Sequence, residues 1–369
     1  EPYARALIKE IKHRAPRFSD RVFDTVYFGG GTPTLLPSAL TADIMSAIKD
    51  NFAVAADAEI TTEANPATID GKKAEVYLNA GFNRGSVGMQ SADDKTLAFL
   101  GRAHNARQFE ETVKTLKTAG FDNINADFML GLPGQTQAAV GETVDYLDRL
   151  GVRHISAYSL ILEKGTPLYS DVKKGKTVLP DDDFTVDLYD AFFRAALRAG
   201  FGRYEVSNFA KKGYECRHNL GYWDRKQYLG LGLGAASLVE EQRFHNTADM
   251  RRYMEIFGEG GRGLAVHAGA GQPLNGETGS ALPGPAAEET ETLSVEDRME
   301  EFMFLGLRKT EGISCRKFQE NFGKSIEEVY GDQISRFKGL GLMKKEGDRL
   351  SLTEHGIDVS NAVFAEFIL

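Results

Sequence analysis

The chain has 369 residues, 42% of them hydrophobic and 26% charged, and its formal net charge is -9 at pH 7. This composition predicts a globular protein with one large domain or two, and it argues against a membrane helix, which needs ~20 apolar residues, and against broad nucleic acid binding. The only cysteines, Cys216 and Cys315, lie outside any CxxC pattern, which argues against a disulfide framework and favours a cytoplasmic location.

Strands and helices are predicted to alternate through the first half of the chain. The hydrophobic periodicity predicts a helix around Ala6–Ile11, a strand over Val22–Phe28, a helix over Ser38–Phe52, a strand over Ala58–Glu63, a helix over Lys72–Ala80, a strand ending at Gln90, a helix over Ala106–Ala119, a strand over Phe121–Leu130, a helix over Thr136–Leu150 and a strand over His154–Leu162. This alternation indicates an α/β fold with a parallel sheet and right-handed crossovers.

Polar candidates for a binding site follow four of these strands. The loop Gly29–Thr32 follows the first strand, and Glu63, Gln90 and Asp127 end the next three. Because parallel strands present their C-terminal ends on one face, these residues are predicted to converge on one pocket. Successive glycines expose backbone N–H groups to an anionic or zwitterionic ligand. A turn without a ligand, a capping role for Glu63 and a buried partner for Asp127 stay open as alternatives.

The second half of the chain changes character. An amphipathic helix is predicted over Asp183–Ala199, and residues 258–292, rich in Gly, Ala, Pro and Glu, predict a flexible linker or insertion without a packed core. Helices predicted from Ser294, over Cys315–Phe322 and over Ser325–Leu340 precede a hairpin over Met343–Thr353. This order of elements indicates a small winged-helix-like α+β domain.

Several motifs together resemble one known family. They are Tyr27–Thr34, Glu63–Pro66, Asn83–Ser91, Leu100–His104, Asp127–Thr136 and Tyr158–Leu160 with Glu163 and Gly165–Leu168. These motifs resemble the radical S-adenosylmethionine superfamily and, within it, the oxygen-independent coproporphyrinogen III oxidase family with its heme-chaperone branch. The resemblance runs over residues 3–237 and again from 293 to the end.

The resemblance implies an incomplete parallel (β/α)6 TIM-like barrel and a set of S-adenosylmethionine ligands. Carried over from the family, these ligands are Gly30, Gly31, Thr32, Glu63, Gln90, Arg102 and Asp127. The glycine loop would hold the methionine end through backbone groups, and Glu63 and Asp127 would accept hydrogen bonds from the amine or the ribose hydroxyls. Gln90 and Arg102 would complete the site, with the Arg102 fork on a carboxylate, although a surface ion pair is the alternative for Arg102.

The family also carries a Cys-x3-Cys-x2-Cys motif in the loop after its first strand, which ligates a [4Fe-4S] cluster. The predicted domains are therefore a partial barrel over residues 1–170 without that strand and loop, an extension over 171–257, the linker or insertion over 258–292 and the winged-helix-like domain over 293–369. The two cysteines of the chain cannot replace three thiolates. We expect the cluster ligands upstream of Glu1, on the hypothesis that the natural protein is longer.

One segment points toward the heme-chaperone branch of the family. His218–Trp223 matches its His-Asn-x-x-Tyr-Trp pattern, in which the imidazole could ligate heme iron and the aromatic rings could stack on a porphyrin. A histidine hydrogen-bonded in a loop, with the aromatic residues in the core, is the structural alternative. Where relatives read Gly-Ala-His-Ser, this chain has Gly234–Ser237 with alanine at position 236.

Three functions compete on these residues. The first is a heme chaperone that binds heme and S-adenosylmethionine and passes heme to acceptor proteins. The second is an oxygen-independent coproporphyrinogen III oxidase that decarboxylates propionates, so whether the chain is an enzyme stays open. The third, a winged-helix nucleic acid reader, is disfavoured by the net negative charge. The sequence identifies neither the electron donor nor the heme acceptor, and it leaves a homodimer open.

Overall fold

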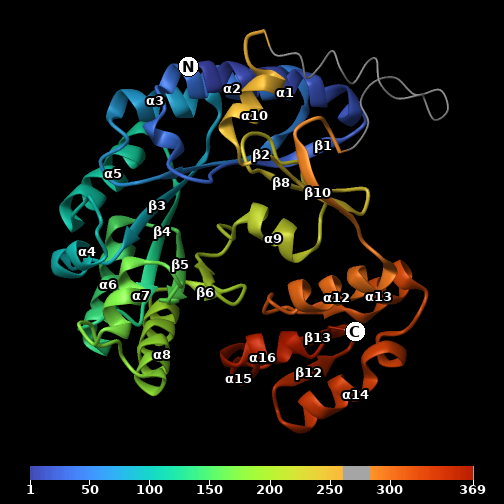
Figure 1. Ribbon diagram of the computed structural model, residues 1–369. Helices are drawn as coiled ribbons and strands as arrows, with labels where there is room; N and C mark the ends of the chain where they lie inside the picture. The colour runs from blue at the N-terminus through green and yellow to red at the C-terminus, as the bar shows by residue number, and fades with distance from the viewer. Residues whose placement is uncertain (261–282, 369) are drawn as a thin grey trace. The chain divides into compact units, whose positions relative to one another are not determined.

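The computed structural model describes residues 1–260 and 283–368, which form two compact units (Figure 1). The first, here the barrel unit, comprises Tyr27–Ser38 and Glu59–Cys216. The second, here the terminal unit, comprises Glu1–Val26, Ala39–Ala58 and the described residues from Arg217 onward. Each unit is described by itself.

A seven-stranded, mostly parallel sheet forms the framework of the fold. Its strands in spatial order are β1 (Val22–Phe28), β2 (Ala53–Ala64), β3 (Arg84–Gln90), β4 (Asn123–Leu130), β5 (His154–Ser159), β7 (Asn208–Ala210) and β6 (Gly202–Arg203). The neighbours from β2 to β5 pair in parallel, whereas β7 is antiparallel to β5 and β6 is antiparallel to β7. The predicted α/β fold with an incomplete barrel-like sheet is confirmed.

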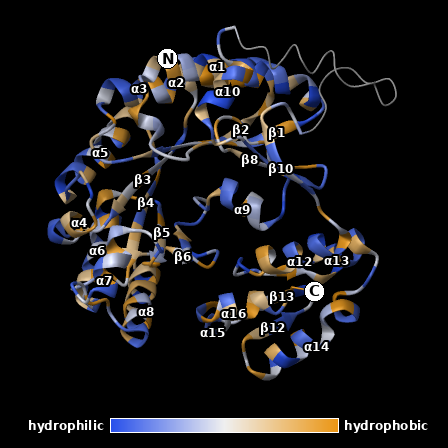
Figure 2. Cartoon of the chain, in the orientation of Figure 1, coloured by the Kyte–Doolittle hydropathy of each residue, from blue (hydrophilic) through white to orange (hydrophobic). Residues whose placement is uncertain are grey.

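Amphipathic helices cover the parallel strands of the barrel unit. They are α3 (Gly71–Ala80), α4 (Asp94–Phe99), α5 (Ala106–Ala119), α6 (Gln137–Leu150), α7 (Pro167–Lys173) and α8 (Asp182–Arg198), with the 3-10 turn η2 (Pro33–Leu35) after the glycine loop. In Figure 1, α5, α6 and α8 lie along one side of β3, β4 and β5. Their hydrophilic and hydrophobic bands alternate in Figure 2, as expected when one face packs on a sheet.

Local sequence signals set the limits of these helices. A capping box formed by Asn105 and Gln108 begins α5, and Gly120, with a φ of 116°, ends it. All seven residues of β3 are buried, because helices and neighbouring strands leave this central strand no free face. On the outer side the rings of Phe192 and Phe209 meet edge to face at 4.9 Å.

The terminal unit contains a second, antiparallel sheet and its helices. The elements are α1 (Pro2–Arg14), the 3-10 turn η1 (Ala15–Phe18), most of α2 (Ser38–Asn51), α9 (Arg217–Trp223), β8 (Ala236–Val239), β9 (Gln242–Asn246), α10 (Met250–Phe257) and β10 (Ala287–Thr292). The strand order is β10-β9-β8. A small core formed by Ala6, Tyr253, Ile256, Phe257 and Ala286 joins α1 and α10.

The C-terminal part of this unit has the predicted α+β composition. Its elements are α12 (Val295–Gly306), β11 (Ile313–Ser314), α13 (Cys315–Phe322), α14 (Ile326–Gly339), β12 (Met343–Glu346), β13 (Arg349–Leu352), α15 (Glu354–Asp358) and α16 (Ser360–Ala365). The predicted hairpin is confirmed: β12 and β13 pair antiparallel, and Gly347 has a φ of 59° in the turn. Among the described helices, none is long and apolar enough to cross a membrane.

Two sequence expectations need correction. Within the predicted linker, residues 261–282 lie outside the described part, but Ala287–Thr292 forms β10, which pairs with β9, and Ala286 is fully buried. The sequence conceals this strand because its side chains are mostly exposed and its order comes from backbone pairing. The segment with His218 is the helix α9 rather than a loop.

Candidate functional site

The glycine loop after β1 presents an open backbone. Gly30 and Gly31 have φ values of 83° and 157°, and a Cβ on either would meet no atom within 4 Å. Position 30 therefore favours glycine because the backbone is left-handed there, and not because a side chain would clash with its neighbours. Gly29 is different, since its Cβ would lie 2.6 Å from the Tyr27 ring and 3.0 Å from the Glu63 carboxyl group. The loop thus lies directly against Glu63.

Two side-chain contacts hold the loop and the end of β2 together. The Tyr27 hydroxyl donates to Glu63 Oε1 at 2.7 Å, and Asn65 Nδ2 donates to Thr32 Oγ1 at 2.7 Å. Burial raises the pKa of Tyr27, and the neighbouring Glu63 adds to this effect, so the phenol stays protonated and keeps its donor role. Thr32 and Glu63 are therefore oriented before any ligand binds.

Gln90 at the end of β3 has an unusual backbone conformation. Its φ is 65°, its side chain is buried, and the register between β3 and β4 shifts between Val87 and Gln90. The Tyr158 hydroxyl donates to Gln90 Oε1 at 2.7 Å, while a Cβ at Gly88 would come within 3.2 Å of Gln90 Nε2. A non-glycine residue in this region costs free energy, and such residues cluster at functional sites and in turns.

Asp127 on β4 has a carboxyl group whose pKa is raised. Burial raises its pKa to about 6, the hydrogen bond from Asn125 opposes the rise, and the negative charge of Glu63 adds to it. Asn125 Nδ2 donates to Asp127 Oδ1 at 2.8 Å. At neutral pH the carboxylate is therefore mostly ionised, in an environment where ionisation is costly.

A series of hydrogen bonds through Asn125, His154 and Tyr204 holds Asp127 in place. The Asn125 amide oxygen lies 2.6 Å from His154 Nδ1, and His154 Nε2 lies 2.7 Å from the Tyr204 hydroxyl. Burial lowers the pKa of His154 well below its usual value, so the ring is neutral. Since the amide oxygen only accepts, the proton belongs on Nδ1 and Tyr204 donates to Nε2. The chain fixes the orientation of Asn125 and hence of Asp127.

Arg102 is exposed, yet it belongs to the same neighbourhood. Burial raises the pKa of Tyr158 to about 12, with Asp127 adding to the rise and the positive charge of Arg102 opposing it. Two residues after Arg102, His104 Nε2 lies 3.1 Å from the Met89 carbonyl oxygen and anchors the segment. The structure thus brings the glycine loop, Glu63, Gln90 and Asp127 together, and the charge of Arg102 acts on Tyr158 beside them; we call these residues, with Arg102, the strand-end cluster.

The sequence assigned no role to three residues that organise this cluster. They are Asn125, His154 and Tyr158. Alternation along β4 could have indicated Asn125, because residues two apart share a face of a strand. Tyr158 lies near the end of the next parallel strand and could have been added by the same rule. His154 begins its strand and contacts the cluster only through Asn125, so no local signal marks it.

His218 lies in the terminal unit, in the first turn of α9. Its Nδ1 is 2.9 Å from Thr25 Oγ1 and its Nε2 is 3.1 Å from the Tyr222 hydroxyl. The rings of His218 and Tyr222 meet edge to face at 4.8 Å. Both ring nitrogens are therefore hydrogen-bonded, as the structural alternative expected, and ligation of iron requires that one of these bonds opens.

The cysteines do not fit an iron-sulfur cluster. Cys216 is buried, with Sγ 3.4 Å from Glu59 Oε1, and Cys315 begins α13 in the C-terminal part. Over residues 1–260 and 283–368, no group of three or more His, Cys, Asp or Glu side chains could hold a metal ion. The chain thus does not supply three cluster thiolates.

Comparison with known proteins decides the family. A profile of the Radical SAM superfamily matches residues 2–147, and one of the HemN C-terminal domain matches residues 293–359. The heme chaperone HemW of Lactococcus lactis subsp. lactis is 32% identical over 369 residues, covering 100% of this chain and 90% of that protein. HemW of Mycobacterium tuberculosis is 34% identical over 358 residues, covering 97% and 84%. The chain belongs to the HemW heme chaperone family.

Membership in the HemW family confirms the predicted resemblance and its heme-chaperone branch. Coproporphyrinogen III oxidase (HemN) from Escherichia coli superposes with a TM-score of 0.79 at 20% identity, covering 99% of this chain and 82% of that chain. That likeness shows the fold. The strand-end cluster lies within the region that the Radical SAM profile matches, and its ligand stays a prediction.

Proposed function

We propose that this protein is a heme chaperone, which binds heme and S-adenosylmethionine and passes heme to acceptor proteins. The observation that carries the proposal is the likeness to HemW relatives along the whole chain. The HNxxYW segment, His218–Trp223, is present as well. Bacterial relatives and two cysteines that are not joined in a disulfide support a cytoplasmic location.

The strand-end cluster would hold S-adenosylmethionine. Its open glycine backbone offers N–H groups to the methionine carboxylate, and Arg102 offers a positive fork to the same group. The carboxylates of Glu63 and Asp127 suit the amine and the ribose hydroxyls, all of which donate hydrogen bonds. When bound, S-adenosylmethionine would supply a sulfonium beside these groups.

Heme would bind through the segment that contains His218. An imidazole nitrogen is a common axial ligand of heme iron, and here it becomes available when the bond to Thr25 or Tyr222 opens. The partners of such a protein are heme and the proteins that accept it. The competing oxidase function is supported by the shared fold, at 20% identity, and by the match to the HemN C-terminal domain.

Hemin titration tests the proposal. The wild-type protein and a His355→Ala control, which removes an exposed histidine of α15, are expected to shift the Soret band of hemin. The His218→Ala variant is expected to lose most of that shift while keeping its far-UV circular dichroism. An unchanged Soret shift in His218→Ala would rule out this ligand, and conversion of coproporphyrinogen III to protoporphyrinogen would favour the oxidase.

A further inference from the structure

A cavity of about 450 Å³ lies within the terminal unit, beside the HNxxYW segment. Its lining comes from α9 and the residues after it, from β8 and β9, and from α12 of the C-terminal part: Tyr222, Trp223, Arg225, Lys226, Tyr228, Leu238, Arg243, Glu301, Phe304 and Leu305. The volume falls within the range of small-molecule sites, about 300–1,000 Å³. None of its residues belongs to the strand-end cluster.

Aromatic rings form much of the wall. Tyr222 and Tyr228 meet edge to face at 4.8 Å, and Phe304 and Trp223 complete the aromatic lining. The Trp223 indole N–H is buried and has no hydrogen-bond partner among the described residues. A buried donor left unpaired costs about 1–3 kcal/mol, which a ligand with an acceptor group would recover. The wall therefore suits a flat ring system that carries oxygen acceptors.

The charged residues of the lining are mostly positive. Three cations, Arg225, Lys226 and Arg243, face the cavity with one carboxylate, Glu301, whose side chain is almost fully buried. Arg225 Nε donates to Glu301 Oε2 at 2.6 Å, and Arg243 also contacts Glu301. Two guanidinium groups thus share one buried carboxylate, and each cation of the lining has a further carboxylate partner outside it: Glu241 for Arg225, Glu291 for Arg243 and Asp24 for Lys226.

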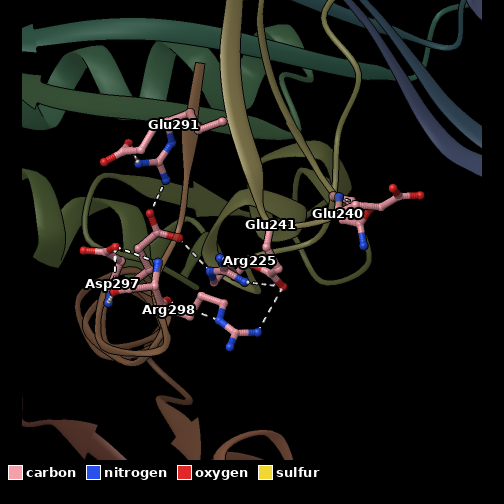
Figure 3. Close-up of polar contacts among 10 residues, drawn as sticks. Arg225, Glu240, Glu241, Glu291, Asp297 and Arg298 are labelled. Carbon is pink, nitrogen blue, oxygen red and sulfur yellow. Dashed lines mark hydrogen bonds and ion pairs between the residues drawn. The ribbon is translucent and has the colours of Figure 1, made fainter. Parts of the chain in front are cut away.

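Carboxylates outside the cavity fix these arginines in place. Figure 3 shows Arg225 and Arg298 reaching toward Glu241, and Glu291 pairs with Arg243 at 3.8 Å. In the bonds to Glu241 and Glu301, Arg225 uses three of its five N–H groups. The guanidinium is therefore held in a defined orientation and keeps donors for a further acceptor.

We infer that this cavity is the porphyrin site, in which the aromatic wall receives the tetrapyrrole and the arginines bind its propionates. The inference rests on the proposed function and deepens it, because it separates recognition of the macrocycle from ligation of the iron. Tyr222 connects the two, since its ring lines the cavity and its hydroxyl contacts His218 Nε2. The C-terminal helix α12 thereby supplies part of the site through Glu301, Phe304 and Leu305.

Metal-free protoporphyrin IX and its dimethyl ester are the probes, because neither contains iron. Trp223 is the only tryptophan of the chain, so quenching of its fluorescence reports binding at this wall, together with the emission of the porphyrin. The wild-type protein is expected to bind the free diacid at least about tenfold more tightly than the dimethyl ester, which cannot form charge-assisted hydrogen bonds to arginine.

The variant Arg243→Gln, at a half-exposed position, is expected to lose about tenfold affinity for the diacid and little for the ester. Its matched control is Arg251→Gln, on the exposed face of α10 and outside the cavity, which is expected to bind like the wild type. Thermal melting and circular dichroism check that both variants fold, and the comparison of diacid with ester in the wild type needs no variant.

The outcomes separate this inference from the proposed function. The cavity assignment is overturned if the diacid and the ester bind with equal affinity, or if the Arg243→Gln variant binds the diacid as the wild type does. In either case a Soret shift of hemin that depends on His218 still supports the chaperone proposal. Absence of any binding of hemin and protoporphyrin to the wild-type protein overturns both. Tight diacid binding that Arg243→Gln weakens supports the cavity even if His218→Ala leaves the hemin spectrum unchanged.

Discussion

Glu10 of the terminal unit and Glu63 of the barrel unit show two uses of a carboxylate. Glu10 is completely buried, and its oxygens accept hydrogen bonds from Asn246 Nδ2 at 2.7 Å, the Tyr253 hydroxyl at 2.6 Å and the Gly232 N–H at 2.8 Å. Within the described residues, Glu63 is only half-buried and accepts one side-chain hydrogen bond, from Tyr27. The first carboxylate is saturated by the protein, and the second retains acceptor capacity.

The residues around the two carboxylates also differ: those around Glu10 enclose it, whereas Glu63 faces an open loop. Arg14 lies 3.7 Å from Glu10, with a side chain that is almost fully buried, and the pair links α1 to the second sheet through Asn246. Glu63 lies against an open glycine loop and near Gln90, whose backbone is strained. Glu10 is enclosed by the groups that bond to it, although Nε and Nη1 of its partner Arg14 have no hydrogen-bond partner among the described residues. An open backbone beside a residue held in a costly conformation is typical of ligand sites instead.

The largest expected effect is on the saturated carboxylate. Glu10→Ala would leave Arg14 buried without its counter-ion and would remove the acceptor of Tyr253, so the free energy of unfolding should fall by about 3–5 kcal/mol. Urea unfolding followed by the fluorescence of Trp223, which belongs to the same unit, measures the loss. As a control in the same unit, Glu366→Ala breaks an exposed ion pair with Arg336 and should change stability by less than about 0.5 kcal/mol. Similar losses of unfolding free energy in both variants would contradict a special structural role for Glu10.

A smaller effect, on binding rather than on folding, is expected for Asp127→Asn. Loss of the charged acceptor should weaken S-adenosylmethionine binding about 10- to 100-fold at pH 7.5, as measured by calorimetry. Because the pKa of Asp127 is raised to about 6, wild-type affinity should fall as the pH drops through 6, and the variant should lack this decline.

The stability of the same variant provides the matched check. The folded-state pKa of Asp127 lies above that of an unfolded Asp, so the ionised carboxyl costs stability above pH 6, and this cost disappears as the pH falls below that value. Asp127→Asn should therefore be at least as stable as the wild type at neutral pH. The charges that also act on Asp127 are those of Glu63 and Arg84, and neither is changed. A strongly destabilised variant would mean that Asp127 is structural, as Glu10 is.

The sequence predicted the strand-end cluster better than the rest of the molecule for a physical reason. Strand periodicity and glycine spacing are local, and parallel strands bring their ends to one face, so Glu63, Gln90 and Asp127 could be grouped without coordinates. The network around Glu10 could not be predicted, because Asn246 and Tyr253 lie more than 230 residues away. Nor could the aromatic and cationic cavity, whose wall combines α9 with α12.

The smallest expected effect tests whether the glycine loop binds a ligand or only turns the chain. Gly30→Ala and Gly323→Ala both place a Cβ on a left-handed backbone, with φ values of 83° and 70°, and in neither case would the Cβ meet an atom within 4 Å. Each should cost about 1–2 kcal/mol of stability through the same backbone strain, as measured by thermal unfolding. Only Gly30→Ala should also weaken S-adenosylmethionine binding, because its methyl group would enter the space next to the backbone N–H groups. If both variants bind S-adenosylmethionine like the wild type, the loop is a turn, and the open space beside it has no role in binding.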